Sequence, residues 1–209
     1  MTNLPENFII NYVLICIIFY LIGSFPTAFV VMKKRFGKDI TKEGSGNVGA
    51  YNSFEVSNSK YIGIIVFVLD FLKGFIPALI MARILEVPFL FSMIPLILIV
   101  SGHNFSVWLK FKGGRGLATG AGIFCALNFW IVIIWCLLYY PAYLVKKDIH
   151  IGNVAATLLL PLVIIFLRPF LASGYTQDFE LLFAFSSSIS LIILLKHINP
   201  ILKIIKDSK

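Results

Sequence analysis

Long runs of apolar residues separated by short polar segments make up most of the chain. Runs long enough to cross the hydrocarbon layer of a bilayer, about 30 Å thick, occupy residues 8–32, 61–84, 87–109, 117–145, 149–168 and 179–195. Uncharged runs of this length are typical of membrane-spanning helices. The pattern therefore predicts an all-α, polytopic membrane helix bundle.

The run from 117 to 145 is too long for one ordinary span. As a single helix it would extend about 43 Å. Two helices that reverse direction near Leu127 and Asn128 would fit better, although two complete spans would need about 40 residues. We therefore expect a short or partly re-entrant hairpin here, which gives about seven membrane segments in total.

The distribution of positive charge predicts the orientation. The sequence has 18 Lys and Arg against 10 Asp and Glu, a net charge of +8, and the cations cluster at the ends of apolar runs. Cytoplasmic loops of membrane proteins are enriched in Lys and Arg. With seven segments, residues 33–60, 110–116, 146–148 and 196–209 all fall in the cytoplasm, with the N-terminus outside. Topology explains the charge, so we expect no nucleic-acid partner.

The remaining composition favours a single integral membrane domain over residues 1–209. The chain is 59% hydrophobic, and its longest polar stretch, 33–60, is too short to bury a core of its own. Glu6 precedes the first apolar run and the cluster 33–35 follows it, the reverse of a secretory signal. The cysteines Cys16, Cys125 and Cys136 lie within apolar runs without Cys-x-x-Cys spacing, so we expect no disulfide, no metal site and no cofactor.

Two charged residues interrupt the run 61–84. Asp70 and Lys73, in "LDFLKG", are spaced i, i+3 and so share one helix face. The simpler interpretation is an ion pair that fixes helix packing. A role facing or supporting a substrate stays open, because charges within a membrane helix are costly.

A first polar loop, "GSGNVGAYN" at 44–52, is rich in small donors. Three glycines alternate with Ser45, Asn47 and Asn52, a composition that disfavours a helix and exposes backbone N–H groups. We interpret Ser45, Gly46, Asn47 and Asn52 as candidate phosphate-binding residues.

A second loop, within "SGHNFSVWLKFKGGRGLATG" at 101–120, combines glycines with cations. Glycine lets backbone N–H groups approach an oxyanion, cations add charge, and a helix that opens at Leu117 would add its dipole. The candidate phosphate ligands here are Lys112, Gly113, Gly114 and Arg115. The loop lacks the spacing of a nucleotide P-loop. A plain positive cytoplasmic loop is the simpler alternative, but it would not require the glycines.

Two histidines are candidates for proton transfer. His103 breaks an apolar run just before the second loop, and His197 follows the last run. A lone histidine at a helix end is more often structural. On the same membrane face as two anion-binding loops, it becomes a candidate proton carrier or phosphate ligand.

These motifs resemble a family, the bacterial membrane glycerol-3-phosphate acyltransferases that take their acyl group from acyl-phosphate. The resemblance covers nearly the whole chain, through "GSFPTAFVV", "GKDITKEGSGNVGAYN", "FVLDFLKGFIPALI" and "GHNFSVWLKFKGGRGLATG", followed by a tail that contains a histidine. It implies a seven-helix bundle in the bacterial inner membrane with its active face cytoplasmic. It also implies that the family's phosphate-binding serine, glycine-loop cation and terminal histidine are Ser45, Arg115 and His197.

The sequence departs from that family at several positions. Family arginines are replaced by Thr41 and Glu55, and a family threonine is replaced by Tyr51. A short Ser-x-x-Ser becomes His150 and Asn153, and the tail motif contains Pro200. Replacing a phosphate-pairing arginine with glutamate exchanges attraction for repulsion. A substrate-altered or non-catalytic paralogue is therefore an alternative, unless other lysines supply the missing charge.

If the family's reaction holds, glycerol-3-phosphate and acyl-phosphate are the substrates, and lysophosphatidate and phosphate are the products. Acyl-phosphate already has a good leaving group, so binding and charge neutralisation should supply most of the rate. Ser45 has no evident triad partner, which favours direct transfer over an acyl-enzyme. A small anion transporter is a less favoured alternative, suggested by the echo of "GNVGA" at 46–50 in "GNVAA" at 152–156.

Overall fold

The computed structural model describes residues 6–171 and 178–207, and within these ranges every regular element is helical. The all-α prediction is confirmed. The elements are α1 (Glu6–Ser24), α2 (Thr27–Phe36), α3 (Ala50–Ser57), α4 (Lys60–Leu79), the π-helix η1 (Ile80–Ile84), α5 (Phe89–Asn104), the 3-10 helix η2 (Val107–Leu109), α6 (Leu117–Leu127), α7 (Phe129–Lys146), α8 (Ile149–Phe166), α9 (Arg168–Leu171), α10 (Phe179–Leu195) and α11 (Ile198–Asp207).

Five helical stretches of the described chain are long and apolar enough to cross a membrane. They are Asn7–Phe36, Lys60–Ile84, Phe89–Leu109, Phe129–Lys146 and Ile149–Phe166. The pair α10 and α11, bent by 50°, makes a sixth if it counts as one broken span, and α6 is a shorter apolar helix. The count of seven segments and the orientation of the termini remain predictions.

The predicted hairpin in 117–145 is confirmed. Helix α6 ends at Leu127 and α7 begins at Phe129, with Asn128 between them in an extended conformation (φ −157°, ψ 101°). The Asn128 side chain accepts a hydrogen bond from the Trp130 amide and donates one to the Leu171 carbonyl. With 11 residues, α6 is about 16 Å long, so this arm of the hairpin is too short for a full span.

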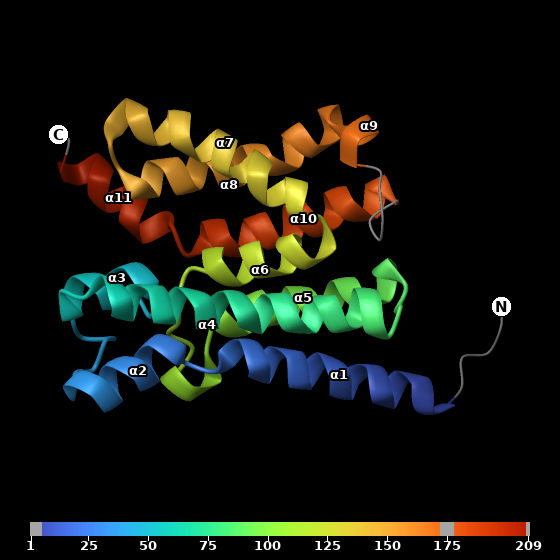
Figure 1. Ribbon diagram of the computed structural model, residues 1–209, viewed down its shortest axis with the longest axis horizontal. Coiled ribbons are helices and arrows are strands. Elements are labelled where there is room, and N and C mark those ends of the chain that lie inside the picture. Colours follow the sequence, from blue (N-terminus) through green and yellow to red (C-terminus); the bar gives the residue numbers. More distant parts are fainter. Residues whose placement is uncertain (1–5, 172–177, 208–209) are drawn as a thin grey trace.

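The polar segments gather at one end of the bundle (Figure 1). Helix α1 begins at the right of the view, and successive long helices run in alternating directions, so that α5, α7 and α10 all end toward the left. The short helices α2, α3 and α11 lie at this left end, where α6 and α8 begin. We call it the polar end. The segments predicted to share one membrane face therefore lie together, as the charge pattern indicated.

Two polar segments contain more helix than the sequence suggested. Residues 44–49 of "GSGNVGAYN" are non-helical, as expected, but α3 begins at Ala50 and includes Tyr51 and Asn52. The tail after His197 forms α11. Its apolar residues Ile198, Ile201, Leu202 and Ile205 recur at helical spacing, which explains why it is helical despite Pro200 in its first turn.

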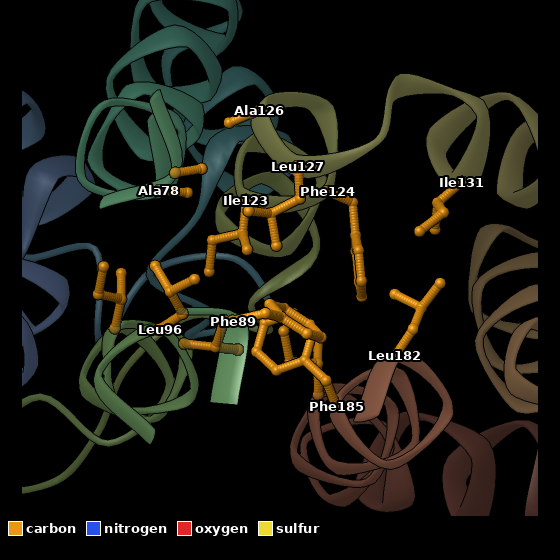
Figure 2. Packing of buried hydrophobic residues seen from close by; sticks show 14 of the residues in the cluster. Ala78, Phe89, Leu96, Ile123, Phe124, Ala126, Leu127, Ile131, Leu182 and Phe185 are labelled. Carbon is orange, nitrogen blue, oxygen red and sulfur yellow. The ribbon is translucent and has the colours of Figure 1, made fainter. Parts of the chain in front are cut away.

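The core of the bundle is apolar and interlocked by aromatic rings (Figure 2). Phe185 of α10 meets Phe89 of α5 and Phe124 of α6 edge to face, at centroid distances of 5.4 and 5.7 Å. Large apolar side chains are exposed outside, Phe166 at 80% and Leu137 at 68%. An apolar exterior of this kind suits contact with lipid rather than water.

Glycines allow the closest helix contacts. A Cβ atom on Gly23 of α1 would collide with the Ile99 carbonyl of α5, and one on Gly74 of α4 would collide with the Thr119 carbonyl of α6. Small residues let membrane helices approach backbone to backbone. These two crossings fix α5 and α6, the helices on either side of the second loop.

Candidate active site

The first loop is held together by the side chain of Asn52, at the start of α3. Its amide nitrogen donates to the carbonyls of Asn47 (2.9 Å) and Glu43 (3.0 Å), and its oxygen accepts from the Ser45 amide (2.9 Å). Asn52 is only 1% exposed. The loop turns through Gly44 and Gly46 at positive φ (57° and 69°), which glycine adopts readily. These contacts hold the shape of the loop, and the prediction that Asn52 binds phosphate stays a prediction.

The other predicted residues of this loop lie at its surface. Ser45 is exposed, and its amide is engaged by Asn52, so its hydroxyl is the group it can offer to a ligand. Gly46 and Asn47 are partly exposed. The Thr41 hydroxyl donates to the Asp39 carboxylate at 2.6 Å. This bond, with lesser help from nearby lysines, lowers the pKa of Asp39.

The second loop packs directly on His103 of α5 and on the first loop. The Gly114 amide donates to the His103 carbonyl (3.0 Å). A Cβ on Gly114 would collide with the His103 ring and lie 2.8 Å from the Val48 carbonyl. Gly113 is pressed in the same way against the His103 and Asn104 carbonyls. The two loops therefore adjoin as predicted. Close packing alone already requires glycine at positions 113 and 114, whether or not these residues also contact an anion.

His103 also reaches a buried ion pair below the loop. The Lys73 ammonium lies 2.8 Å from the Asp70 carboxylate, and both side chains are nearly buried. Lys73 also donates to the Phe25 carbonyl (2.9 Å) and the Thr27 hydroxyl (3.2 Å), while the nearest His103 nitrogen is 3.7 Å from Asp70. The predicted ion pair is confirmed, and it ties α4 to the α1–α2 junction. His103 lies between this pair and the second loop.

Arg115 leaves the second loop toward α8 and α10. One of its terminal nitrogens is 3.3 Å from Nδ1 of His150, in the first turn of α8. The His150 ring in turn meets the His197 ring at a centroid distance of 6.1 Å. Burial lowers the pKa of Arg115, and the charge of Glu55 opposes that shift. Arginine stays protonated despite such a shift, so the cluster Arg115–His150–His197 contains a fixed positive charge.

His197 presents an unpaired nitrogen within this cluster. Its Nδ1 lies 2.9 Å from the Ile193 carbonyl, and because a carbonyl only accepts, Nδ1 must carry the proton. The Nε2 atom is then an acceptor, and it has no hydrogen-bond partner among the described residues although His197 is 1% exposed. A buried acceptor of this kind is suited to receive a proton from a bound hydroxyl group.

Lys112 and His150 differ in their sequence predictions: Lys112 was predicted as a ligand and His150 was not. The Lys112 side chain is exposed, and its binding of phosphate stays a prediction. His150 was noted only as a departure from the family and was not predicted as a site residue. Its position in the first turn of α8 carries no local signal, because it reaches Arg115 only through the tertiary fold. Over residues 6–171 and 178–207, no three His, Cys, Asp or Glu side chains are grouped to hold a metal.

The fold and site together define a polytopic membrane protein with a cationic cluster, Arg115–His150–His197, at the polar end of the bundle. The chain belongs to the glycerol-3-phosphate acyltransferase family, whose model matches residues 13–207.

Curated relatives and solved structures agree with this assignment. A glycerol-3-phosphate acyltransferase of Endomicrobium trichonymphae is 36% identical over 197 residues, which cover 94% of each chain. One from Staphylococcus haemolyticus is 31% identical and covers 94% of this chain and 96% of its own. The crystal structure of PlsY, an integral membrane glycerol 3-phosphate acyltransferase, in its glycerol 3-phosphate form superimposes with a TM-score of 0.79 at 30% identity, covering 94% of this chain and 93% of its own.

Proposed function

We propose that this protein transfers an acyl group from acyl-phosphate to glycerol-3-phosphate, giving 1-acylglycerol-3-phosphate and inorganic phosphate. The observation that carries the proposal is that Arg115 and His197 both contact His150, in a chain that matches the family over almost its entire length. The glycerol hydroxyl oxygen attacks the acyl carbonyl carbon. The bond from that carbon to the phosphate oxygen then breaks, and phosphate leaves.

His197 is the proposed acceptor of the hydroxyl proton. Its Nε2 carries a lone pair and is otherwise unpartnered within the described chain. The ring is fixed by the bond from Nδ1 to the Ile193 carbonyl, as a general base requires. His103, the other histidine predicted for proton transfer, is assigned to supporting the second loop, because its ring packs against Gly114.

Phosphate binding is proposed for the two loops. Arg115 supplies a fixed cation, the Ser45 hydroxyl can donate, and the backbone N–H groups of Asn47 and Gly113 can approach an oxyanion. The Gly46 and Gly114 amides already donate to the Glu43 and His103 carbonyls, so these two glycines contribute by letting the loops turn and pack closely. Exposed Lys112 raises the local positive potential. Asn52 contributes through the shape of the first loop.

An apolar cavity next to Arg115 is suited to the acyl chain. It has a volume of about 270 Å³ and lies between α4, α6, α7, α8 and α10. Its wall includes Leu117 and Ala118, which begin α6 two residues after Arg115. A donor with its phosphate at Arg115 could therefore place its chain in this cavity, away from water. We place the protein in the bacterial inner membrane with the polar end in the cytoplasm, since the lysine-rich segments gather there.

Glu55 supports one alternative, a family member with an altered substrate. The negative charge of Glu55 raises the pKa of Arg115, so Glu55 lies close enough to repel a phosphate bound at Arg115. Such a protein would retain acyl transfer but prefer an acceptor with less negative charge.

The test is a product assay with purified protein in detergent. Acyl-phosphate and labelled glycerol-3-phosphate should give labelled lysophosphatidate and one phosphate per product. Acyl-coenzyme A in place of acyl-phosphate should give none. Product formed only from acyl-coenzyme A would refute acyl-phosphate as the donor. Acyl transfer to glycerol but not to glycerol-3-phosphate would favour the alternative of an altered acceptor.

A further inference from the structure

We infer that His150 is a positioning residue, which fixes the guanidinium of Arg115 by accepting a hydrogen bond at Nδ1. The inference rests on the proposed function, because it gives Arg115 the task of binding a substrate phosphate. It adds His150 to the residues that form the site.

The contact has only one chemically possible direction. Arg115 lies 3.3 Å from Nδ1 of His150, and a guanidinium has donors but no acceptor. Nδ1 must therefore carry the lone pair, which places the hydrogen of the neutral ring on Nε2. A protonated His150 would instead set a second cation against Arg115 and break the bond.

The backbone of His150 is held in place for this contact. Asp148 caps the start of α8, and its carboxylate accepts from the amides of His150 (2.7 Å) and Ile151 (3.1 Å). The ring is further confined by the edge-to-face contact with His197. His150 is therefore a fixed acceptor for the long side chain of Arg115.

Orientation matters because a guanidinium is a planar fork. It binds a phosphate through two parallel N–H bonds only when its plane faces the anion. A long side chain loses much rotational freedom when it is fixed. An acceptor that holds one N–H in advance reduces that loss on ligand binding, so removing it should weaken phosphate binding with little effect on the chemical step.

Two conservative variants separate this role from direct contact with the substrate. In His150→Asn the side-chain oxygen can occupy the place of Nδ1, whereas in His150→Gln the amide reaches the place of Nε2. If Nδ1 holds Arg115, asparagine should rescue function and glutamine should not. If His150 instead touches the substrate through Nε2, the order should reverse.

The experiment measures glycerol-3-phosphate binding by calorimetry, and KM and kcat by product formation, with purified protein in detergent. We expect His150→Ala to raise Kd and KM about ten-fold with kcat within about two-fold, and His150→Asn to stay within about three-fold of the parent. In an Arg115→Ala background, His150→Ala should cause no further change. Thermal unfolding of each variant checks that the bundle is intact.

Additive effects of the two alanine changes, rescue by glutamine alone, or a fall confined to kcat would each overturn the inference. A parent protein that binds glycerol-3-phosphate without forming product would refute the proposed reaction, while the binding measurements would still decide the role of His150. A parent that binds neither glycerol-3-phosphate nor inorganic phosphate would refute both.

Discussion

The imidazole of His103 occupies the space that a side chain on Gly114 would need, so that the second loop rests directly on α5. Gly114→Ala should push the loop away from both His103 and the Val48 carbonyl. We expect a clear fall in melting temperature and at least a ten-fold loss of kcat/KM. Gly120→Ala is the matched control for stability, because its Cβ would meet only the Ile189 and Ile193 side chains, no closer than 3.4 Å. Equal melting temperatures for the two variants would contradict this packing.

The Asp70–Lys73 pair should be expensive to break. Lys73→Met leaves the Asp70 carboxylate buried without its cation, which typically costs about 3–5 kcal/mol. Adding Asp70→Asn should recover part of that loss, because it removes the stranded charge. Lys42→Met is the control. Lys42 is exposed and its ammonium is as far as 3.9 Å from the Asp39 carboxylate, and an exposed ion pair of this kind contributes about 0–1 kcal/mol. Unfolding in detergent followed by circular dichroism measures all four proteins.

Glu55 should weaken phosphate binding by repulsion. Glu55→Gln removes the carboxylate that acts on Arg115, so KM for glycerol-3-phosphate should fall by about two- to five-fold at low salt and less at high salt. Glu55→Arg should lower KM further if the new cation reaches the pocket. A KM that rises in Glu55→Gln would show instead that the carboxylate helps to hold Arg115.

Accessibility labelling can test the predicted orientation. In a background with the native cysteines replaced, cysteines at Ser45, Lys112 and Lys206 should react with an impermeant reagent only from the cytoplasmic side. A cysteine at Glu86, between η1 and α5, should react from the outside, because these elements lie opposite the polar end (Figure 1). Labelling of position 206 from outside would overturn the seven-segment count.

The sequence predicted features that depend on length and local chemistry. Residues 117–145 were too long for one span and too short for two, and the chain does break at Asn128. The Asp70–Lys73 pair followed from i, i+3 spacing in an apolar setting. The helix at Ala50 was missed because a glycine-rich composition hid the start of α3 at Gly49.

Contacts between distant segments could not be read from the sequence in the same way. The spacing of Arg115 and His150 contains no periodic signal, since their meeting depends on how α6, α7 and α8 reverse direction. Asn52 appeared to be a ligand because its side chain suits phosphate. In the structure its side chain bonds to backbone groups of its own loop, a local interaction that asparagine commonly makes in turns.

The central claim is that Arg115 binds a substrate phosphate at the polar end of the bundle. The most direct measurement is KM for glycerol-3-phosphate in Arg115→Ala, compared with Arg83→Ala, which removes an exposed cation from η1 at the opposite end. The account predicts that KM rises at least ten-fold in Arg115→Ala, equivalent to about 1.4 kcal/mol, and stays within about two-fold in Arg83→Ala. An unchanged KM and kcat in Arg115→Ala would contradict the claim and leave Arg115 as an ordinary positive residue of a cytoplasmic loop.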